Sequence, residues 1–284
     1  MNGLILKVDC PDQHGIVAKI ASYVASYAGN LVEFSQFTDA PNEKFFARVE
    51  IDTTNLSVDV SDFISGFNTL GKSLKANWTF RHQPYKMKTA VLVTKTDHCL
   101  NEILWRTKLG EMPVEITSII GNRDTCKQIA DNAGIPFHHV EMDGDKKEAG
   151  FKKIRELLIE QEVELTVLAR FMQILPDWFC QEFSGKIINI HHSFLPAFIG
   201  ANPYRQAYER GVKLIGATCH YVTSELDAGS IIEQEVNRVQ HFHSAKDLMR
   251  LGRDCERTAL ARGIRSHVNE RTIIDRNRAI VFPD

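Results

Sequence analysis

The chain has 284 residues, which is enough for about two domains, each with its own hydrophobic core. With 43% hydrophobic, 25% charged and 9% aromatic residues, its composition excludes long disorder, fibrous repeats and a disulfide scaffold. The 34 Lys and Arg residues face 36 Asp and Glu residues, a net charge of -2. The bulk positive charge of a nucleic-acid-binding protein is therefore missing, and no nucleic-acid partner is expected.

The chain shows no sign of a membrane or secretory segment. No stretch of about 18 uncharged apolar residues occurs, and the apolar Leu4–Leu6 run stops at Lys7. We therefore expect a cytoplasmic protein without a membrane partner. The 6 cysteines are scattered and form no C-x-x-C pair, so they are expected to be small buried side chains rather than zinc ligands or a redox pair.

The N-terminal third of the chain has the pattern of a small mixed domain. Alternating apolar residues predict strands near residues 3–9, 31–37, 44–51 and 75–81. Helical spacing from Ile16 and from Val60 predicts two helices, which should end at Gly29–Asn30 and at Gly71. The order βαββαβ is typical of a ferredoxin-like sandwich, in which both helices cover one face of an antiparallel sheet.

The segment Asp9–Val17, within this order of elements, resembles the ACT family of small regulatory domains. The resemblance implies that sheets pair between subunits in a homo-oligomer, a dimer or a tetramer, and that an amino-acid effector binds near the first strand–helix turn. The matching positions are Asp9, Asp12, His14 and Gly15. A glycine lets backbone approach a ligand closely, and a helix N-terminus can receive a carboxylate. Alternatively, Asp12 caps the helix and the module serves assembly only.

A short polar stretch with a proline predicts a linker over residues 84–88, between a first domain over 1–83 and a second over 89–284. In the second domain short apolar runs alternate with helical stretches, the last of them near 245–267. This alternation predicts a Rossmann-like, mostly parallel sheet with helices on both faces. In such sheets, ligands bind beyond the carboxyl ends of the strands.

One predicted strand of this domain runs directly into polar residues. Asn189 and His191 are two apart, so they project from the same face of the strand, whereas His192 points the other way. An amide beside an imidazole can stabilise a developing oxyanion and move protons near neutral pH. Alone, an Asn-x-His pair is more often structural. Because adjacent strand histidines face opposite ways, no metal site is expected.

Asp227 is the second candidate. It lies in a turn-prone loop between the strand-like runs Gly216–Val222 and Ile231–Ile232. From there a carboxylate can orient a histidine and stabilise its positive charge. A single loop aspartate is more often a turn former than a catalytic residue, so the combination with the Asn-x-His pair decides the interpretation.

The ordered motifs between Asn189 and Ile232 resemble the family of formyltransferases that use 10-formyltetrahydrofolate, and the similarity spans about residues 88–284. The resemblance implies that Asn189, His191 and Asp227 form the catalytic trio.

The same resemblance assigns further positions. It gives Thr218 and His220 supporting roles and implies a cis Leu195–Pro196 bond. The folate-binding residues that it implies are Arg170, Phe171, Met172, Gln173, Leu175, Glu225, Leu226 and Gly229. Gln173 stands where purine-forming relatives have an arginine, which leaves Arg170 as a candidate to hold the glutamate tail.

The sequence departs from the transferases at the acceptor side. Transferases that make a purine intermediate have a Gly-rich loop after the first strand, whose backbone N–H groups hold the acceptor phosphate. Here that place reads Thr94–Leu100 without a glycine, and Asp97 adds a negative charge that repels phosphate. Transferases that formylate initiator tRNA carry an additional C-terminal domain, and this chain ends soon after its last predicted helix. Water therefore becomes the expected nucleophile.

An ACT module followed by the segments Asp97–Leu100, Pro136–His139 and Tyr208–Thr218 is similar, over nearly the whole chain, to the formyltetrahydrofolate deformylases. The resemblance implies hydrolysis of 10-formyltetrahydrofolate to tetrahydrofolate and formate, which supplies formate and balances one-carbon pools for purine biosynthesis. No cofactor is expected beyond this substrate. A formyl transferase with an unidentified acceptor is the alternative.

In the expected mechanism, His191 and Asp227 position and deprotonate a water, Asn189 donates to the tetrahedral oxyanion, and the imidazolium assists departure of N10. Two other classes fit less well. A non-enzymatic amino-acid sensor would not need the trio. A nicotinamide-dependent oxidoreductase would need a G-x-G-x-x-G segment after a first strand, which neither domain has.

Overall fold

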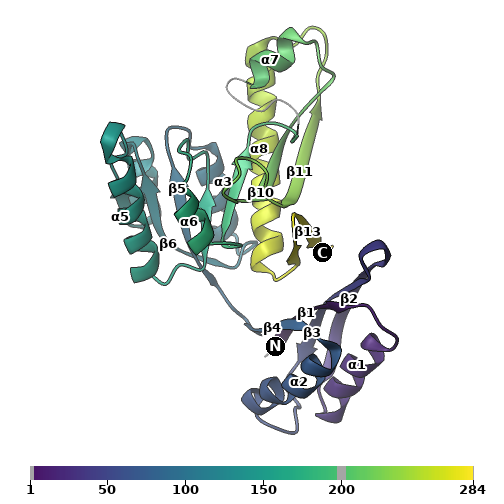
Figure 1. Ribbon diagram of the computed structural model, residues 1–284. Coiled ribbons are helices and arrows are strands. Elements are labelled where there is room, and N and C mark those ends of the chain that lie inside the picture. The colour runs from purple at the N-terminus through teal and green to yellow at the C-terminus, as the bar shows by residue number, and fades with distance from the viewer. Residues whose placement is uncertain (1–2, 197–202, 284) are drawn as a thin grey trace. The chain divides into compact units, whose positions relative to one another are not determined.

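The computed structural model describes residues 3–196 and 203–283, and the chain divides into two compact units. Unit 1 contains residues 3–85 together with 269–273 and 280–283, and unit 2 contains the other described residues. Figure 1 shows the elements of both units. The boundary between Tyr85 and Lys86 falls inside the stretch that the sequence predicted as a linker.

Unit 1 has a four-stranded antiparallel sheet in the order β2-β3-β1-β4. Its elements are β1 (Gly3–Pro11), α1 (Ile16–Ser26), β2 (Asn30–Asp39), β3 (Lys44–Asp52), α2 (Val60–Leu74) and β4 (Asn77–Gln83). Both helices pack on one face of the sheet, where Ile20, Phe63 and Phe67 join the buried strand residues (Figure 1). This order and layering confirm the predicted ferredoxin-like fold.

Both predicted helix ends in unit 1 are wrong by a few residues. Helix α1 ends at Ser26, and Ala28 rather than Gly29 takes the left-handed conformation, with φ 59°. Helix α2 continues past Gly71 to Leu74, and Lys75 turns the chain with φ 54°. Gly71 has a packing role instead, because a Cβ there would lie 2.4 Å from Cζ3 of Trp78. Tertiary contact, which local sequence does not encode, explains this glycine.

The C-terminal residues of unit 1 lie against its sheet. Glu270 is buried and forms ion pairs with Lys7 of β1 at 2.6 Å and with Arg81 of β4 at 2.9 Å. Phe46 of β3 forms a small apolar cluster with Ile273 and Phe282. The sequence assigned all of residues 89–284 to one domain, because the linker was the only boundary that its composition indicated. Here the charges of Lys7 and Arg81 are matched by an acidic residue from far along the chain.

Unit 2 is built on a seven-stranded sheet in the order β11-β10-β9-β8-β5-β6-β7. Its strands are β5 (Met87–Val93), β6 (Val114–Gly121), β7 (Phe137–His139), β8 (Leu165–Leu168), β9 (Ile187–His191), β10 (Leu214–Tyr221) and β11 (Ile231–Arg238). Pairing is parallel from β9 to β7 and antiparallel at β9–β10 and β10–β11. The predicted mostly parallel sheet is confirmed.

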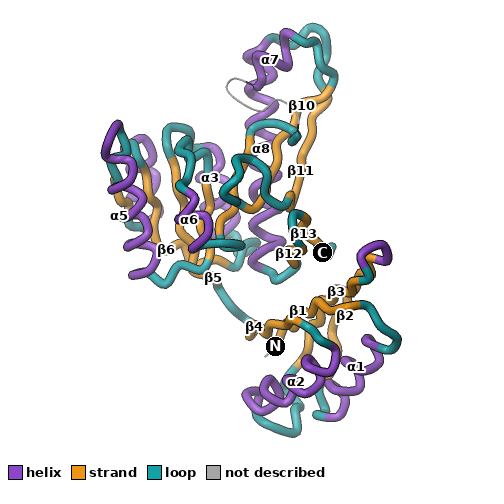
Figure 2. Tube along the Cα trace, in the orientation of Figure 1, coloured by secondary structure: helices purple, strands orange, loops and turns teal. Residues whose placement is uncertain are grey.

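Two groups of helices accompany this sheet (Figure 2). The helices are α3 (His98–Lys108), α4 (Lys127–Ala133), α5 (Lys147–Glu160), α6 (Asp177–Glu182), α7 (Pro203–Glu209) and α8 (Ala245–Val268). Phe151 of α5 and Phe179 of α6 pack in one apolar cluster with Leu92 of β5. Helix α8 contacts α3 and strands β9, β10 and β11. The short helices α6 and α7 were not predicted, because six or seven residues hold too little periodicity.

Two short strands near the C-terminus, β12 (Thr272–Asp275) and β13 (Arg278–Val281), form a separate two-stranded sheet. All 6 cysteines are free and buried, as the sequence predicts. Within residues 3–196 and 203–283, none of the helices has the length and apolar character needed to span a bilayer.

Candidate active site

A pocket of about 600 Å³ opens in unit 2 where strands β8 and β9 end. The segment after β8 forms one wall, the loop over residues 222–227 after β10 forms another, and one face of α8 forms a third. The carboxyl ends of adjacent parallel strands meet at one edge of a sheet, which is where ligands bind in this class of fold. The sequence predicted a site at this edge.

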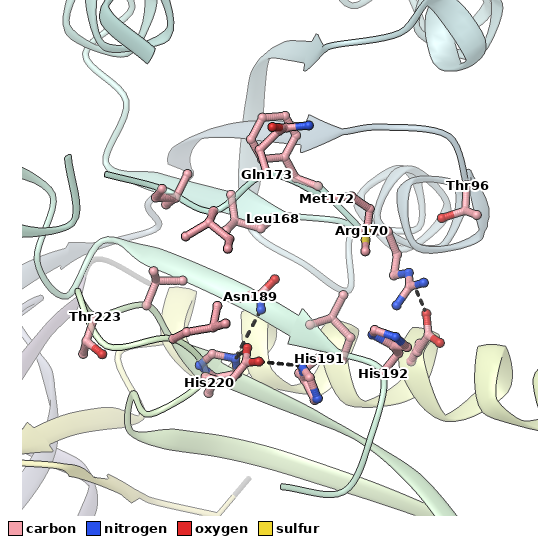
Figure 3. A pocket seen from close by; sticks show the side chains of 18 of the residues that line it. Thr96, Leu168, Arg170, Met172, Gln173, Asn189, His191, His192, His220 and Thr223 are labelled. Atoms are coloured by element: carbon pink, nitrogen blue, oxygen red, sulfur yellow. Dashed lines mark hydrogen bonds and ion pairs between the residues drawn. The ribbon is translucent and has the colours of Figure 1, made fainter. Parts of the chain in front are cut away.

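The three predicted catalytic side chains meet in this pocket (Figure 3). Asn189 and His191 project from the end of β9, and Asp227 comes from the loop after β10. Nδ1 of His191 lies 3.2 Å from Oδ2 of Asp227, and Nε2 of His220 lies 3.7 Å from Oδ1 of the same carboxylate. One carboxylate thus faces two imidazoles, and it can stabilise a positive charge that forms on His191.

His220 fixes the orientation of the Asn189 amide. Nδ1 of His220 lies 2.8 Å from the Tyr221 carbonyl oxygen, which can only accept, so Nδ1 carries the hydrogen. In the neutral ring Nε2 must then accept, and Nδ2 of Asn189 donates to it at 3.2 Å. The second hydrogen of that amide nitrogen remains for another acceptor. Asn189 is therefore set up as a donor, which is what a developing oxyanion requires.

The protonation states in the site follow from burial and charge. Burial lowers the pKa of His220 and outweighs both the Tyr221 hydrogen bond and the Asp227 charge, which act in the opposite direction. For Asp227, burial acts to raise the pKa, but the hydrogen bond and charge of His191 lower it below its usual range. At neutral pH the site therefore holds a neutral His220 and an ionised Asp227.

Thr218 supports the site without lining the pocket. Its buried hydroxyl donates to the Ser193 carbonyl at 2.9 Å and accepts from the Leu195 backbone N–H at 3.0 Å. These bonds tie β10 to the segment that follows β9, in which the Leu195–Pro196 bond is cis, as the resemblance implied. Residues 197–202, which continue this segment, lie outside the described part of the chain.

The loop that carries Asp227 contains a left-handed residue and a close backbone approach. Asp227 itself is left-handed, with φ 55°, a conformation that aspartate tolerates better than most residues. Two residues later, a Cβ on Gly229 would lie 1.7 Å from the Tyr221 carbonyl oxygen. Gly229, which the resemblance placed among the folate residues, does not line the pocket. Its lack of a side chain lets the loop close against β10 beside His220.

The other folate residues implied by the resemblance do line the pocket: Arg170, Phe171, Met172, Gln173, Leu175, Glu225 and Leu226. Met172 and Leu226 are 57% and 58% exposed, which leaves apolar surface available at the mouth for a flat ligand. Arg170 does not stand free as a tail anchor. Its side chain is only 16% exposed, and its Nε lies 3.4 Å from Glu256.

A buried glutamate that the sequence analysis did not single out lies at the other end of the pocket. Oε2 of Glu256, on α8, lies 2.8 Å from Nε2 of His98, and Oε1 accepts from the Tyr204 hydroxyl at 2.7 Å. Burial acts to raise the pKa of Glu256, but the His98 hydrogen bond, the Arg170 charge and the Tyr204 hydrogen bond lower it. Asp227 and Glu256 are therefore both ionised, and each lies beside a histidine of the pocket.

Comparison with known proteins shows the family of this chain. Residues 87–264 match the family model described as formyl transferase. The chain is 45% identical to the formyltetrahydrofolate deformylase of Synechocystis over 277 residues, which cover 98% of this chain and 97% of the relative. It is 41% identical to the deformylase of Bacillus subtilis over 278 residues, or 98% of this chain and 93% of the relative.

The chain belongs to the formyltetrahydrofolate deformylases. A solved structure gives the same result. The crystal structure of a formyltetrahydrofolate deformylase from Pseudomonas syringae pv. tomato matches with a TM-score of 0.97 at 41% identity, covering 100% of this chain and 95% of that one. The family resemblance and the fold class expected from the sequence are confirmed.

The structure changes the explanation of why a phosphorylated acceptor does not fit this pocket. Asp97 was expected to repel a phosphate there, but it is exposed and accepts from Asn101 at 3.1 Å. The acidic residue that lines the pocket at this end, beside His98, is Glu256. The signal for it was available in the sequence, because Glu256 falls on the buried stripe of α8 with Gly252 and Ala259. An acidic residue on a buried stripe is rarely buried without partners.

The described residues include one cluster of metal-ligand types, formed by His98, Cys99 and Glu256. Arg170 places a permanent positive charge beside the same carboxylate, which opposes a cation. Burial, followed by the charge of Glu256, also raises the pKa of the Cys99 thiol well above its ordinary value. The donor set therefore does not favour a metal.

The prediction that His192 points away from the site is wrong. Strand β9 ends at His191, so the alternation of side chains does not extend to the next residue. His192 lines the same pocket, and its ring centroid is 5.3 Å from that of His191.

Of the four residues proposed for an effector, Asp9 lies in β1, and Asp12, His14 and Gly15 lie in the turn between β1 and α1. Gly15 has φ 81° and occupies the N-cap position of α1, where no side chain caps the helix. Asp12 therefore does not cap α1, contrary to the alternative from the sequence. Asp12 and His14 are exposed, and Asp9 accepts from the Asn77 amide at 2.9 Å.

Proposed function

We propose that this protein hydrolyses 10-formyltetrahydrofolate to tetrahydrofolate and formate through Asn189, His191 and Asp227. One observation carries the proposal: in a chain of the deformylase family, these three side chains meet in one pocket, with an amide donor, an imidazole and a carboxylate within hydrogen-bonding reach. Such a set provides oxyanion stabilisation and proton transfer, the two requirements of amide hydrolysis.

Each residue has a definite part. Asn189, oriented by His220, donates an amide hydrogen to the oxygen of the formyl group as it becomes an oxyanion. Asp227 holds Nδ1 of His191 and stabilises the imidazolium, which supplies the proton that N10 needs when the C–N bond breaks. Because water is the nucleophile, the reaction requires no cofactor. The formate produced supplies one-carbon metabolism and purine biosynthesis.

The folate would lie along the wall after β8 and under the loop after β10. Phe171, Met172 and Leu226 offer apolar surface for its ring systems, and Glu225 and Gln173 offer polar groups at the mouth. Glu256 places a buried negative charge at the acceptor end, which disfavours a phosphorylated acceptor and so favours water over formyl transfer. The alternative, a transferase with an unidentified acceptor, has no observation in its favour.

Unit 1 would serve regulation or assembly. The ferredoxin-like order and the turn at Asp9, Asp12, His14 and Gly15 support an ACT-like module that binds an amino-acid effector and joins subunits into a homo-oligomer. A calorimetric screen of the twenty amino acids tests the effector. Heat of binding that disappears in an Asp12→Ala variant is expected, and no binding by any of the twenty would contradict it.

The primary test is formate release from 10-formyltetrahydrofolate by the purified protein without an added acceptor. Asp227→Asn removes the charge that supports the imidazolium, and we expect it to lower kcat by about a hundred- to ten-thousand-fold. His241→Gln, at an exposed histidine outside the pocket, is the matched control and should keep wild-type activity. Substrate binding without formate release by the wild type would point to a transferase instead.

A further inference from the structure

His192 is the one histidine of the pocket for which the described residues offer no polar contact. His98 pairs with Glu256, His191 with Asp227, and His220 with Asn189 and Tyr221. His192 makes ring contacts only, with His191 at 5.3 Å and with Tyr204 at 6.2 Å between centroids. A half-buried imidazole in a pocket, without a polar partner from the described residues, has both nitrogens available to a molecule that enters.

His191 has only one ring nitrogen left for proton transfer. Its Nδ1 faces Asp227, and its Nε2 is buried without a hydrogen-bond partner among the described residues. Because this single nitrogen is assigned to protonate N10, a second group must accept the proton of the water. His192 is the adjacent imidazole, and it lies between His191 and Arg170 (Figure 3).

The surroundings of His192 keep its ring unprotonated before the reaction. Burial, followed by the positive charge of Arg170, lowers its pKa to about 4, so the ring is neutral and able to accept at neutral pH. His191 acts in the same direction, whereas Glu256 and Asp227 act in the opposite one. The two carboxylates would stabilise the imidazolium once it forms. The oxyanion that develops in the same step adds a third negative charge nearby.

We propose that His192 is a further catalytic residue, which takes the proton from the attacking water. This inference rests on the proposed deformylase function. In the first step the water oxygen bonds to the formyl carbon, and its proton passes to a ring nitrogen of His192, while Asn189 stabilises the oxyanion. In the second step the C–N10 bond breaks and N10 receives a proton from the His191 imidazolium. The formic acid returns a proton to His191, His192 releases its own to solvent, and formate leaves.

The test compares His192→Gln and His192→Asn with the wild type and with His241→Gln, an exposed control. Both amides keep hydrogen-bonding capacity but cannot take a proton. Formate release is measured against pH, and calorimetry with tetrahydrofolate, the product, reports the integrity of the pocket. We expect kcat to fall by about a hundred- to ten-thousand-fold in both variants, with tetrahydrofolate affinity within threefold of the wild type. The residual rate should rise in proportion to hydroxide, which replaces the base-activated water.

Three results would overturn the inference. One is a kcat within threefold of the wild type in either variant. Another is a residual rate with the pH profile of the wild type, which would assign His192 a positioning role. The third is loss of tetrahydrofolate binding in both variants, which would make the residue structural. The failure of the function itself is distinguishable, because it shows as absence of formate release by the wild type in the same assay.

Discussion

Asn189 donates from Nδ2 to Nε2 of His220 across 3.2 Å, and this bond determines which end of the amide faces the substrate side of the site. The imidazole can act as acceptor because its other nitrogen donates to the Tyr221 carbonyl, and burial keeps the ring neutral by lowering its pKa. His220, which is buried and acts only through Asn189, thus determines that the amide presents its N–H group to the oxyanion.

Replacing His220 with phenylalanine should therefore lower kcat more than it changes KM. The Asn189 amide loses its acceptor and can rotate its oxygen toward the oxyanion, so we expect a decrease in kcat of about ten- to a hundred-fold. The Tyr221 carbonyl also loses its donor, at a cost of about 1–3 kcal/mol in the free energy of unfolding. Steady-state kinetics and urea titration measure the two effects, and an unchanged kcat would remove His220 from the mechanism.

Truncating Asn189 to alanine removes the oxyanion donor itself. The expected loss in kcat is about a hundred- to a thousand-fold, with KM within threefold, because the interaction forms only in the transition state. Asn189→Asp is the informative companion variant. It keeps the size of the side chain but opposes the oxyanion with a negative charge, so it should be no more active than the alanine variant. An aspartate variant near wild-type activity would contradict the assigned role.

Gly229→Ala should destabilise unit 2 and lower activity together. The new Cβ would lie 1.7 Å from the Tyr221 carbonyl oxygen, so the loop must move away from β10 and carry Asp227 with it. Overpacking of this kind costs about 1–3 kcal/mol in the free energy of unfolding. His241→Gln, at an exposed residue outside the pocket, is the control and should leave both quantities unchanged. Denaturant unfolding and formate release check the prediction.

Acidification should destabilise the wild type partly through His192. Its folded pKa of about 4 lies below the ordinary value of 6.5, so the unfolded chain binds this proton more readily. Above pH 6.5 the ring is neutral in both the folded and the unfolded chain, so it does not affect stability. As the pH falls from 6.5 through about 4, the free energy of unfolding decreases by at most about 3 kcal/mol. His192→Gln should lose less stability over this window. Urea titrations at several pH values would reveal equal losses if the residue contributes nothing.

Much of this protein follows from the order of its residues alone. Period-2 and helical apolar patterns predict the βαββαβ unit and the parallel sheet, because each face that must be buried repeats locally along the chain. The placement of Asn189 and His191 on one face of β9 follows from the two-residue repeat of a strand. The family motif adds Asp227, 36 positions beyond His191, although no local rule connects the two.

The tertiary structure decided what the local patterns do not contain. Glu256 meets His98 across 158 positions and Tyr204 across 52, and Glu270 meets Lys7 and Arg81 from the opposite end of the chain. His192 joined the pocket because β9 ends one residue earlier, and Gly71 lies inside a helix because a tryptophan packs on it. Such contacts depend on how distant segments pack, and burying a charge requires partners that only the folded chain brings within reach.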